Sequence, residues 1–355
     1  MGKPVLINDQ DCDIDLPCPV DDQYITEGGI PEGQQTTPML ATIHVVRSIG
    51  QLTRTLRSTT VSPATLETFE RHFNTCLATF PPHLHPKTDH NLDPRSLAPI
   101  IYLQNARLLL HRHNIAPYCQ NIVRSTAMDY CVSTAMDTAS VLSRCMRVQS
   151  GPSNWRVLFA SCAGTLLCTH IWRCALFLLF RQEFAAALAC IQASAAVGND
   201  RAINVACGRY LAFFLRALLD RFRQGHFGDL DHDEEMMAYV SGDMQGTTDG
   251  SWVWQGSEMG LQPEAMAPMR NTSAPPELEV EETRESSEKS WDWIESTVQE
   301  LVSEKQRRDM ERREVGSVTS QQGSTPTLNA ESAASDTTDG RSSSAHSRMD
   351  IASLI

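Results

Sequence analysis

The chain has 355 residues and a formal net charge of −13, with 30 lysine and arginine residues against 43 aspartate and glutamate residues. Residues 33–228 are nevertheless basic, with nineteen bases and nine acids, whereas residues 1–32, 229–240 and 241–355 are acidic. This uneven distribution of charge excludes a uniformly acidic protein, and the overall net charge alone does not exclude an anionic partner. Because no basic and apolar leader opens the sequence and the cysteine count is an odd eleven, we expect no secretory signal and reduced thiols in a nuclear or cytosolic setting.

Residues 1–36 are expected to form an extended acidic lead-in, because four prolines interrupt any helix there. From Pro38 the apolar residues recur every three or four positions, which predicts a first helix. A second helix is predicted from Ser62, an N-cap residue followed by proline, to the pair Pro81-Pro82.

Five further helical stretches are predicted in the basic part of the chain. They are Pro94–His113, Met128–Cys145, Trp155–Phe180, Glu183–Val197 and Asn204–Gln224. No segment alternates as a strand does, and no internal repeat is visible. The predicted fold class is therefore all-α: a regulatory domain of about seven helices over residues 37–228.

Val157–Phe180 is long and apolar enough to be considered as a membrane span. His170 and Arg173 lie near its centre, and a charge at that depth costs about 2.5 kcal/mol or more. A buried core helix explains this composition better, so no membrane partner is expected.

Residues 229–355 are expected to form an acidic and mostly disordered tail, since Gly, Ser, Thr, Pro and Glu dominate after Tyr239. One amphipathic helix is predicted in the tail at about 290–313, capped by Ser290. Its apolar face would be made of Trp291, Ile294, Val298 and Leu301. Residues 277–300 hold nine acids and two bases around two tryptophans, which fits either an activation segment or a solvated tail with one helix docked on the body.

A basic cluster lies toward the end of that predicted helix, made of Lys305, Arg307, Arg308, Arg312 and Arg313. It fits a nuclear import signal, but acids are interleaved with it. An ordinary charged helix end is the favoured interpretation.

The common catalytic motifs are absent from the sequence: there is no G-x-S-x-G, no phosphate-binding loop, no dinucleotide fingerprint and no H-E-x-x-H. We therefore predict that the chain is not an enzyme and name no catalytic residue. Alternating acids at Asp9, Asp11, Asp13 and Asp15 suggest a calcium loop. Neither register provides the Gly and Glu that an EF-hand requires, so an acidic segment, solvated or lying on basic helices, is favoured.

The cysteines and histidines give no metal site. Cys162, Cys168 and Cys174 are six residues apart, so on one helix their thiols would point to three sides. They are interpreted as small buried hydrophobic residues. We assign no metal ligand and no cofactor to this chain, and its cofactor-binding residues stay unknown.

Two groups of histidines were considered separately. His83, His85 and His90 share one loop and would bind a metal only in a special loop conformation. His111 and His113 lie at a helix end and are expected to meet free carbonyl groups there.

The positive charge of the body comes from eighteen arginines and one lysine. The arginines are spaced singly along helices, as at Arg47, Arg54 and Arg57, without a clustered patch. Pairing with carboxylates or helix ends is favoured over phosphate binding.

Four segments, taken in order, resemble one known family. They are GKPVLINDQDCDIDLPCPVDDQYI, YLQNARLLLHRHNIAP, LLCTHIWRCALFLLF and VGNDRAINVACGRYLAFFL. They resemble the regulatory middle homology region of fungal zinc-cluster transcription factors, also called the fungal-specific transcription factor domain. The resemblance covers about residues 1–225 and agrees with the all-α prediction.

The resemblance implies a nuclear regulator of transcription. Members of this family read DNA through an N-terminal six-cysteine cluster that holds two zinc ions, often dimerise through a coiled-coil linker, and recruit the transcription machinery or regulatory proteins through acidic C-terminal regions. The present sequence resembles the family only from the interior of the middle region onward, so the zinc cluster and the first part of the helical domain are not represented in it. We therefore expect a fragment, or a form lacking the DNA reader, with DNA contacted only through the missing cluster.

Two hypotheses follow for the function. The first is the regulatory and activation part of a fungal zinc-cluster transcription factor, with a small-molecule effector and a homodimer left open. The alternative is a partner-binding or inhibitory helical module with no DNA binding of its own.

Overall fold

The computed structural model describes residues 27, 38–116, 118–147, 155–225, 230–241 and 291–310. The described part contains nine α-helices up to residue 241, four short 3-10 turns and a helix over 291–310, and it contains no strand. The predicted all-α class is therefore confirmed. The expectations for the lead-in of residues 1–36, including Asp9 to Asp15, and for most of the tail lie outside the described residues.

The first two helices follow the sequence signals closely. Helix α1 is Pro38–Thr55 and α2 is Pro63–Ala78. The Ser62 side chain accepts a hydrogen bond from the backbone N–H of Thr65 at 3.2 Å, and Pro63 occupies the first turn, as predicted.

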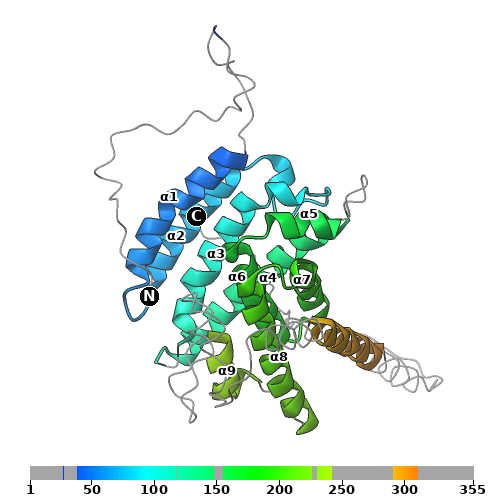
Figure 1. Ribbon diagram of the computed structural model, residues 1–355. Coiled ribbons are helices and arrows are strands. Elements are labelled where there is room, and N and C mark those ends of the chain that lie inside the picture. The colour runs from blue at the N-terminus through cyan, green and yellow to red at the C-terminus, as the bar shows by residue number, and fades with distance from the viewer. Residues whose placement is uncertain are drawn as a thin grey trace, which may run out of the picture. The chain divides into compact units, whose positions relative to one another are not determined.

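The remaining helices pack around α6, which runs through the middle of the body (Figure 1). Their bounds are α3 Ala98–Arg112, α4 Asn121–Met146, α5 Trp155–Cys162, α6 Thr165–Phe180, α7 Phe184–Val197, α8 Ala202–Arg223 and α9 Glu234–Ser241. The 3-10 turns are Pro82–Leu84, Pro94–Ser96, His113–Ile115 and Leu230–His232.

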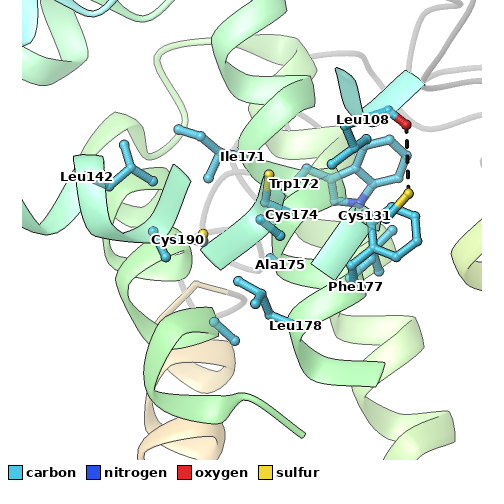
Figure 2. Packing of buried hydrophobic residues seen from close by; sticks show 14 of the residues in the cluster. Leu108, Cys131, Leu142, Ile171, Trp172, Cys174, Ala175, Phe177, Leu178 and Cys190 are labelled. Atoms are coloured by element: carbon cyan, nitrogen blue, oxygen red, sulfur yellow. Dashed lines mark hydrogen bonds between the residues drawn. The ribbon is translucent and has the colours of Figure 1, made fainter. Parts of the chain in front are cut away.

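Helix α6 is buried on all sides, since every residue from Leu167 to Phe180 lies in the interior. Figure 2 shows Trp172, Cys174 and Phe177 packed within it among side chains from α3, α4 and α7. The indole of Trp172 meets the ring of Tyr210 from α8 edge to face, with 5.3 Å between ring centroids. The prediction of a core helix here is confirmed.

The two basic residues of α6, His170 and Arg173, are accommodated inside the body. His170 is fully buried, and its Nε2 lies 3.0 Å from the Thr138 hydroxyl. Burial lowers the pKa of His170 to about 3, so the imidazole is neutral. Arg173 contacts the Asn105 amide oxygen at 3.4 Å and lies over the Trp172 ring.

Two stretches of the described chain reach the length and apolarity of a membrane span. One is α8, and half of its apolar window is buried in the protein. The other is the bent α5–α6 pair taken as one span.

The single helix predicted over Trp155–Phe180 is wrong. The chain leaves the helix after Cys162 and starts α6 at Thr165, and the two helices meet at 112°. Gly164 lies between them in an extended conformation, and glycine costs a helix interior about 1 kcal/mol. Phe159 of α5 is buried in the core with α6, and the bend places Cys162 on a different helix from Cys168 and Cys174.

The helical body extends past residue 228, because α9 belongs to its core. Met236 and Val240 are fully buried, and the Tyr210 hydroxyl donates to the Tyr239 carbonyl at 2.7 Å. Arg112 of α3 donates to the Ser241 carbonyl at the end of α9 at 3.0 Å. The acidic stretch that the sequence assigns to the tail is therefore a structural part of the body.

Acids of this stretch neutralise arginines of the body. Arg124 holds Glu234 through two hydrogen bonds of 3.0 and 2.9 Å. Arg221 of α8 bonds Asp233 at 2.6 Å, and Asp233 in turn accepts from the N–H of Met236 in the first turn of α9. These pairs fix α9 against both α4 and α8.

The histidine loop is organised by a buried arginine. Arg144 is 1 % exposed, and its guanidinium donates to the backbone carbonyls of His90 at 2.7 Å, His85 at 2.9 Å and His83. The three histidines thus contribute main-chain oxygens that satisfy a buried cation, rather than imidazoles directed at a metal.

Replacing Arg144 tests this arrangement. Arg144→Met removes the guanidinium donors from the carbonyls of His83, His85 and His90, of which His85 keeps the Thr88 N–H at 3.2 Å, and we expect a loss of about 2 kcal/mol in the free energy of unfolding, measured by urea denaturation. The matched control is Arg147→Met, whose exposed side chain pairs only with exposed Asp89 and should change stability by less than about 1 kcal/mol. Equal midpoints for the two variants would contradict the role given to Arg144.

As the pH falls, α9 should detach from the body before the other helices unfold. The hydrogen bonds from Arg124 lower the pKa of Glu234. Partial burial opposes ionisation of Asp233, but its hydrogen bonds to Arg221 and Met236 outweigh this and leave its pKa lowered. A lowered carboxyl pKa means stability that is present above the unfolded-state value and lost as pH falls through the folded-state value.

We therefore expect amide protection of residues 234–241 to fall below about pH 4.5, before that of α6, in hydrogen-exchange measurements from pH 7 to pH 3. Glu234→Gln removes one titrating partner and should flatten this dependence. Simultaneous loss of protection in α6 and α9 would count against a separate acid response of α9.

Candidate helix-binding site

The histidines at the end of α3 have different partners. His113 Nε2 lies 2.6 Å from the carbonyl of Ser58, so its carbonyl partner comes from the segment after α1 and not from the helix end where the sequence predicted it. For His111 the prediction is wrong: its Nε2 lies 3.0 Å from a Glu70 carboxylate oxygen of α2, and its ring stacks on Tyr130 at 4.3 Å. His111 faces into the body, where helix packing brings a carboxylate to it.

The three cysteines considered as ligands do not converge on a metal site. Cys168 and Cys174 are buried in α6, and burial raises their pKa to about 11 and about 12. Their interpretation as small hydrophobic residues is confirmed, whereas Cys162 is only half-buried at the α5–α6 bend. Within the described ranges, no group of three or more His, Cys, Asp or Glu side chains could hold a metal ion.

Several arginines of the body pair with carboxylates, as predicted. Besides the contacts of α9, Arg181 bonds Asp129 at 2.8 Å and Asp231 at 2.7 Å, and Arg107 lies 3.3 Å from Glu70. For Arg47 and Arg54 of α1 and for Arg57 just after it, pairing stays a prediction.

An open groove of about 510 Å³ lies between α1 and α2. Phe69 and His72 line it together with hydroxyl groups. The hydroxyls of Thr55 and Thr68 donate to carbonyls of their own helices, at 3.0 and 2.8 Å, so toward the groove they offer acceptor lone pairs. No pattern in the sequence selects these residues, because the groove exists only once the two helices pack.

The most elaborate surface feature of the body is the seat of the 291–310 helix. Residues 291–306 belong to the same compact unit as the helices described above. Trp291, Ile294 and Val298 are buried and form part of the core, while Leu301 is partly buried against it. The predicted apolar face is confirmed, and its docking on the body answers one question that the sequence left open.

Gly208, in the interior of α8, forms the deepest point of this seat. A Cβ atom at this position would lie 3.0 Å from both Cε2 and Cζ2 of Trp291. The missing side chain therefore lets the indole lie directly on the α8 backbone. A glycine costs a helix interior about 1 kcal/mol relative to alanine, and the indole gives a physical reason for it here.

Polar contacts surround this apolar centre. The Arg216 guanidinium lies 5.1 Å above the Trp293 ring, and Gln192 of α7 donates to Glu295 at 3.2 Å. Lys305 donates to the Gln182 carbonyl at 2.8 Å, in the turn between α6 and α7. Because residues 295 and 305 meet residues 192 and 182 in reverse order, the docked segment runs antiparallel to α7. Its ribbon passes beside that of α7 in Figure 2.

We call this seat the Gly208 groove and define it by Gly208 and Arg216 of α8, Gln192 of α7, and Gln182 and Glu183 in the preceding turn. The three buried anchors favour docking, since burying a large apolar side chain contributes about 1.5–3 kcal/mol, and the polar contacts around them set its register.

The helix face was visible in the sequence, but the groove was not. The only signal for the groove was one glycine within an apolar helical stretch, which indicates a close approach without saying of what. No family model matches the chain, and no curated protein and no solved structure matches it either.

The space left by the missing side chain of Gly208, which we call the Gly208 notch, receives the Trp291 indole. A side chain that fills this notch should therefore undock the 291–306 segment. Gly208→Leu places a branched side chain where the indole lies, so we expect the amides of residues 294–306 to lose at least about tenfold of their hydrogen-exchange protection. Ala202→Leu, at the exposed start of α8, is the matched control and should leave that protection unchanged. Unchanged protection in Gly208→Leu would show that the notch does not hold the helix.

Proposed function

We propose that this chain is the regulatory and activation part of a nuclear transcription regulator of the fungal zinc-cluster kind, with no enzymatic activity and no membrane association. The observation that carries the proposal is the 291–306 helix, which is acidic and tryptophan-bearing and is held by an all-α body. In this proposal, zinc and sequence-specific DNA contacts belong to the six-cysteine cluster of such factors and to no residue of this chain.

The positions of the resembling segments support a single regulatory domain. The segment YLQNARLLLHR lies in α3, LLCTHIWRCALFLLF in α6, and the last part of VGNDRAINVACGRYLAFFL in α8. These three helices meet in one core, with Trp172 of α6 against Tyr210 of α8. The similarity therefore falls on residues that pack together rather than on scattered surface positions.

The acidic helix has the composition expected of a segment that recruits transcription proteins. Asp292 and Glu300 are exposed, and Trp293 is partly exposed over Arg216. Aromatic and aliphatic anchors among acids are a common pattern for helices that dock in apolar grooves of partners. The groove between α1 and α2 is the place we propose for a small-molecule effector, because its volume of about 510 Å³ is in the range of ligand sites and an aromatic ring and hydroxyl groups line it.

A second candidate function has its own supporting observation. Trp291, Ile294 and Val298 are all buried against the body, so the apolar face of the helix is occupied. This arrangement also fits a partner-binding or inhibitory helical module without DNA binding of its own.

A reporter assay separates the two candidates. Residues 277–313 fused to a foreign DNA-binding domain should activate a reporter, and the double change Trp291→Ala and Trp293→Ala should reduce activation at least about fivefold by removing the aromatic anchors. Ser303→Ala, on the exposed side of the helix, is the control. A silent wild-type fusion that is expressed at the control's level would favour the module without a transcriptional role.

A further inference from the structure

We propose that the Gly208 groove is an exchange site, which binds in turn the chain's own residues 291–306 and an acidic amphipathic helix of a partner protein. Binding of the partner would release the chain's own helix. This inference goes beyond the transcriptional role and does not depend on it, since both occupants can be measured with the purified chain.

The buried footprint of the chain's own helix is short. Its fully buried residues are confined to the first two turns, Trp291 to Val298, and from Gln299 to Gln306 none is buried. In that second half Leu301 and Val302 are only partly buried against the core, and Lys305 reaches the turn before α7. A competing helix therefore needs to displace fully buried anchors over two turns only.

The groove carries cationic groups that its present occupant does not fully use. Arg209 and Arg216 are seven residues apart on α8 and both are exposed, so they lie on the same side of the helix. Arg216 faces the ring of Trp293, and within the described ranges Arg209 has no ion pair or hydrogen bond. Glu295, an acid of the docked helix, is bonded to the neutral Gln192. A helix that places a carboxylate beside Arg209 gains an interaction that residues 291–306 do not make.

These features define the chemistry of the partner. It is a helix with an aromatic ring for the Gly208 notch and aliphatic residues three and seven positions further on, as in the chain's own Trp291, Ile294 and Val298. It also carries acids on the side that faces Arg209 and Arg216. A basic or uncharged helix would lack the carboxylates that pair with Arg209 and Arg216.

Tethering explains why the chain's own helix occupies the groove without a partner. Forty-nine residues separate Ser241 from Trp291, so docking is intramolecular. A partner competes against an effective concentration of about a millimolar or less. The helix of a second copy has the same anchors but no tether, so it competes poorly, and a partner with better charge complementarity is the favoured occupant.

The first test uses the full chain and a labelled peptide of residues 286–312 as probe. Ile294→Asp in the chain removes the chain's own anchor and leaves the groove intact, so the peptide should bind this variant at least about tenfold more tightly than the wild-type chain in fluorescence anisotropy. Adding Gly208→Leu to that variant should abolish binding, whereas adding Ala202→Leu should not. Equal affinity for the wild-type and Ile294→Asp chains, or binding that survives Gly208→Leu, would overturn the proposal.

The second test asks what the groove selects. Display of a random helical peptide library against the full-length Ile294→Asp chain should enrich an aromatic residue followed by aliphatic residues at three and seven positions, with flanking Asp or Glu. Arg209→Glu together with Arg216→Glu should remove the preference for acids. Enrichment of basic helices would overturn the proposal. So would a wild-type chain that sediments as a helix-exchanged dimer at micromolar concentration, because the occupant would then be a second copy.

Discussion

The burial of α6 is the constraint on which the rest of the body depends. A helix that is apolar on every side has no face to give to water, so other helices must cover it all round. Helices α3, α4, α7 and α8 do so, and its two basic residues are accommodated within the protein: His170 is neutral beside Thr138, and Arg173 contacts Asn105 and the Trp172 ring. The covering helices then need covers of their own, which α9 and residues 291–298 supply.

The charge pattern has a structural meaning in this light. The acidic segment after the basic body neutralises part of its charge, because Asp231, Asp233 and Glu234 bind Arg181 just after α6, Arg221 of α8 and Arg124 of α4. Arg144 differs from these three, since its guanidinium donates to three backbone carbonyls. Internal ion pairs and hydrogen bonds therefore use part of the positive charge of the body. Exposed cations such as Arg209 and Arg216 are the candidates for binding an acidic partner.

The sequence predicted those features whose cause is local. The cap at Ser62 and the apolar face of the 291–310 helix depend on residue spacing, and both are confirmed. The break at Gly164 was missed because the residues on either side are equally apolar, and α9 was missed because its eight residues are embedded in acids. The partners of Arg144 and His111 depend on which segments packing brings together. The Gly208 groove is of the same kind, since two distant parts of the chain create it, and a lone glycine indicated only that something approaches.

The function proposed for this chain requires residues 291–306 to lie antiparallel to α7 in the Gly208 groove. A site-specific photo-crosslink tests this docking most directly. A photoreactive amino acid in place of Glu295, whose carboxylate lies 3.2 Å from the Gln192 amide, should form intramolecular crosslinks to α7 within one turn of Gln192, mapped by mass spectrometry. Crosslinks spread over unrelated parts of the body, or found only between different molecules, would contradict the docked helix and the function built on it.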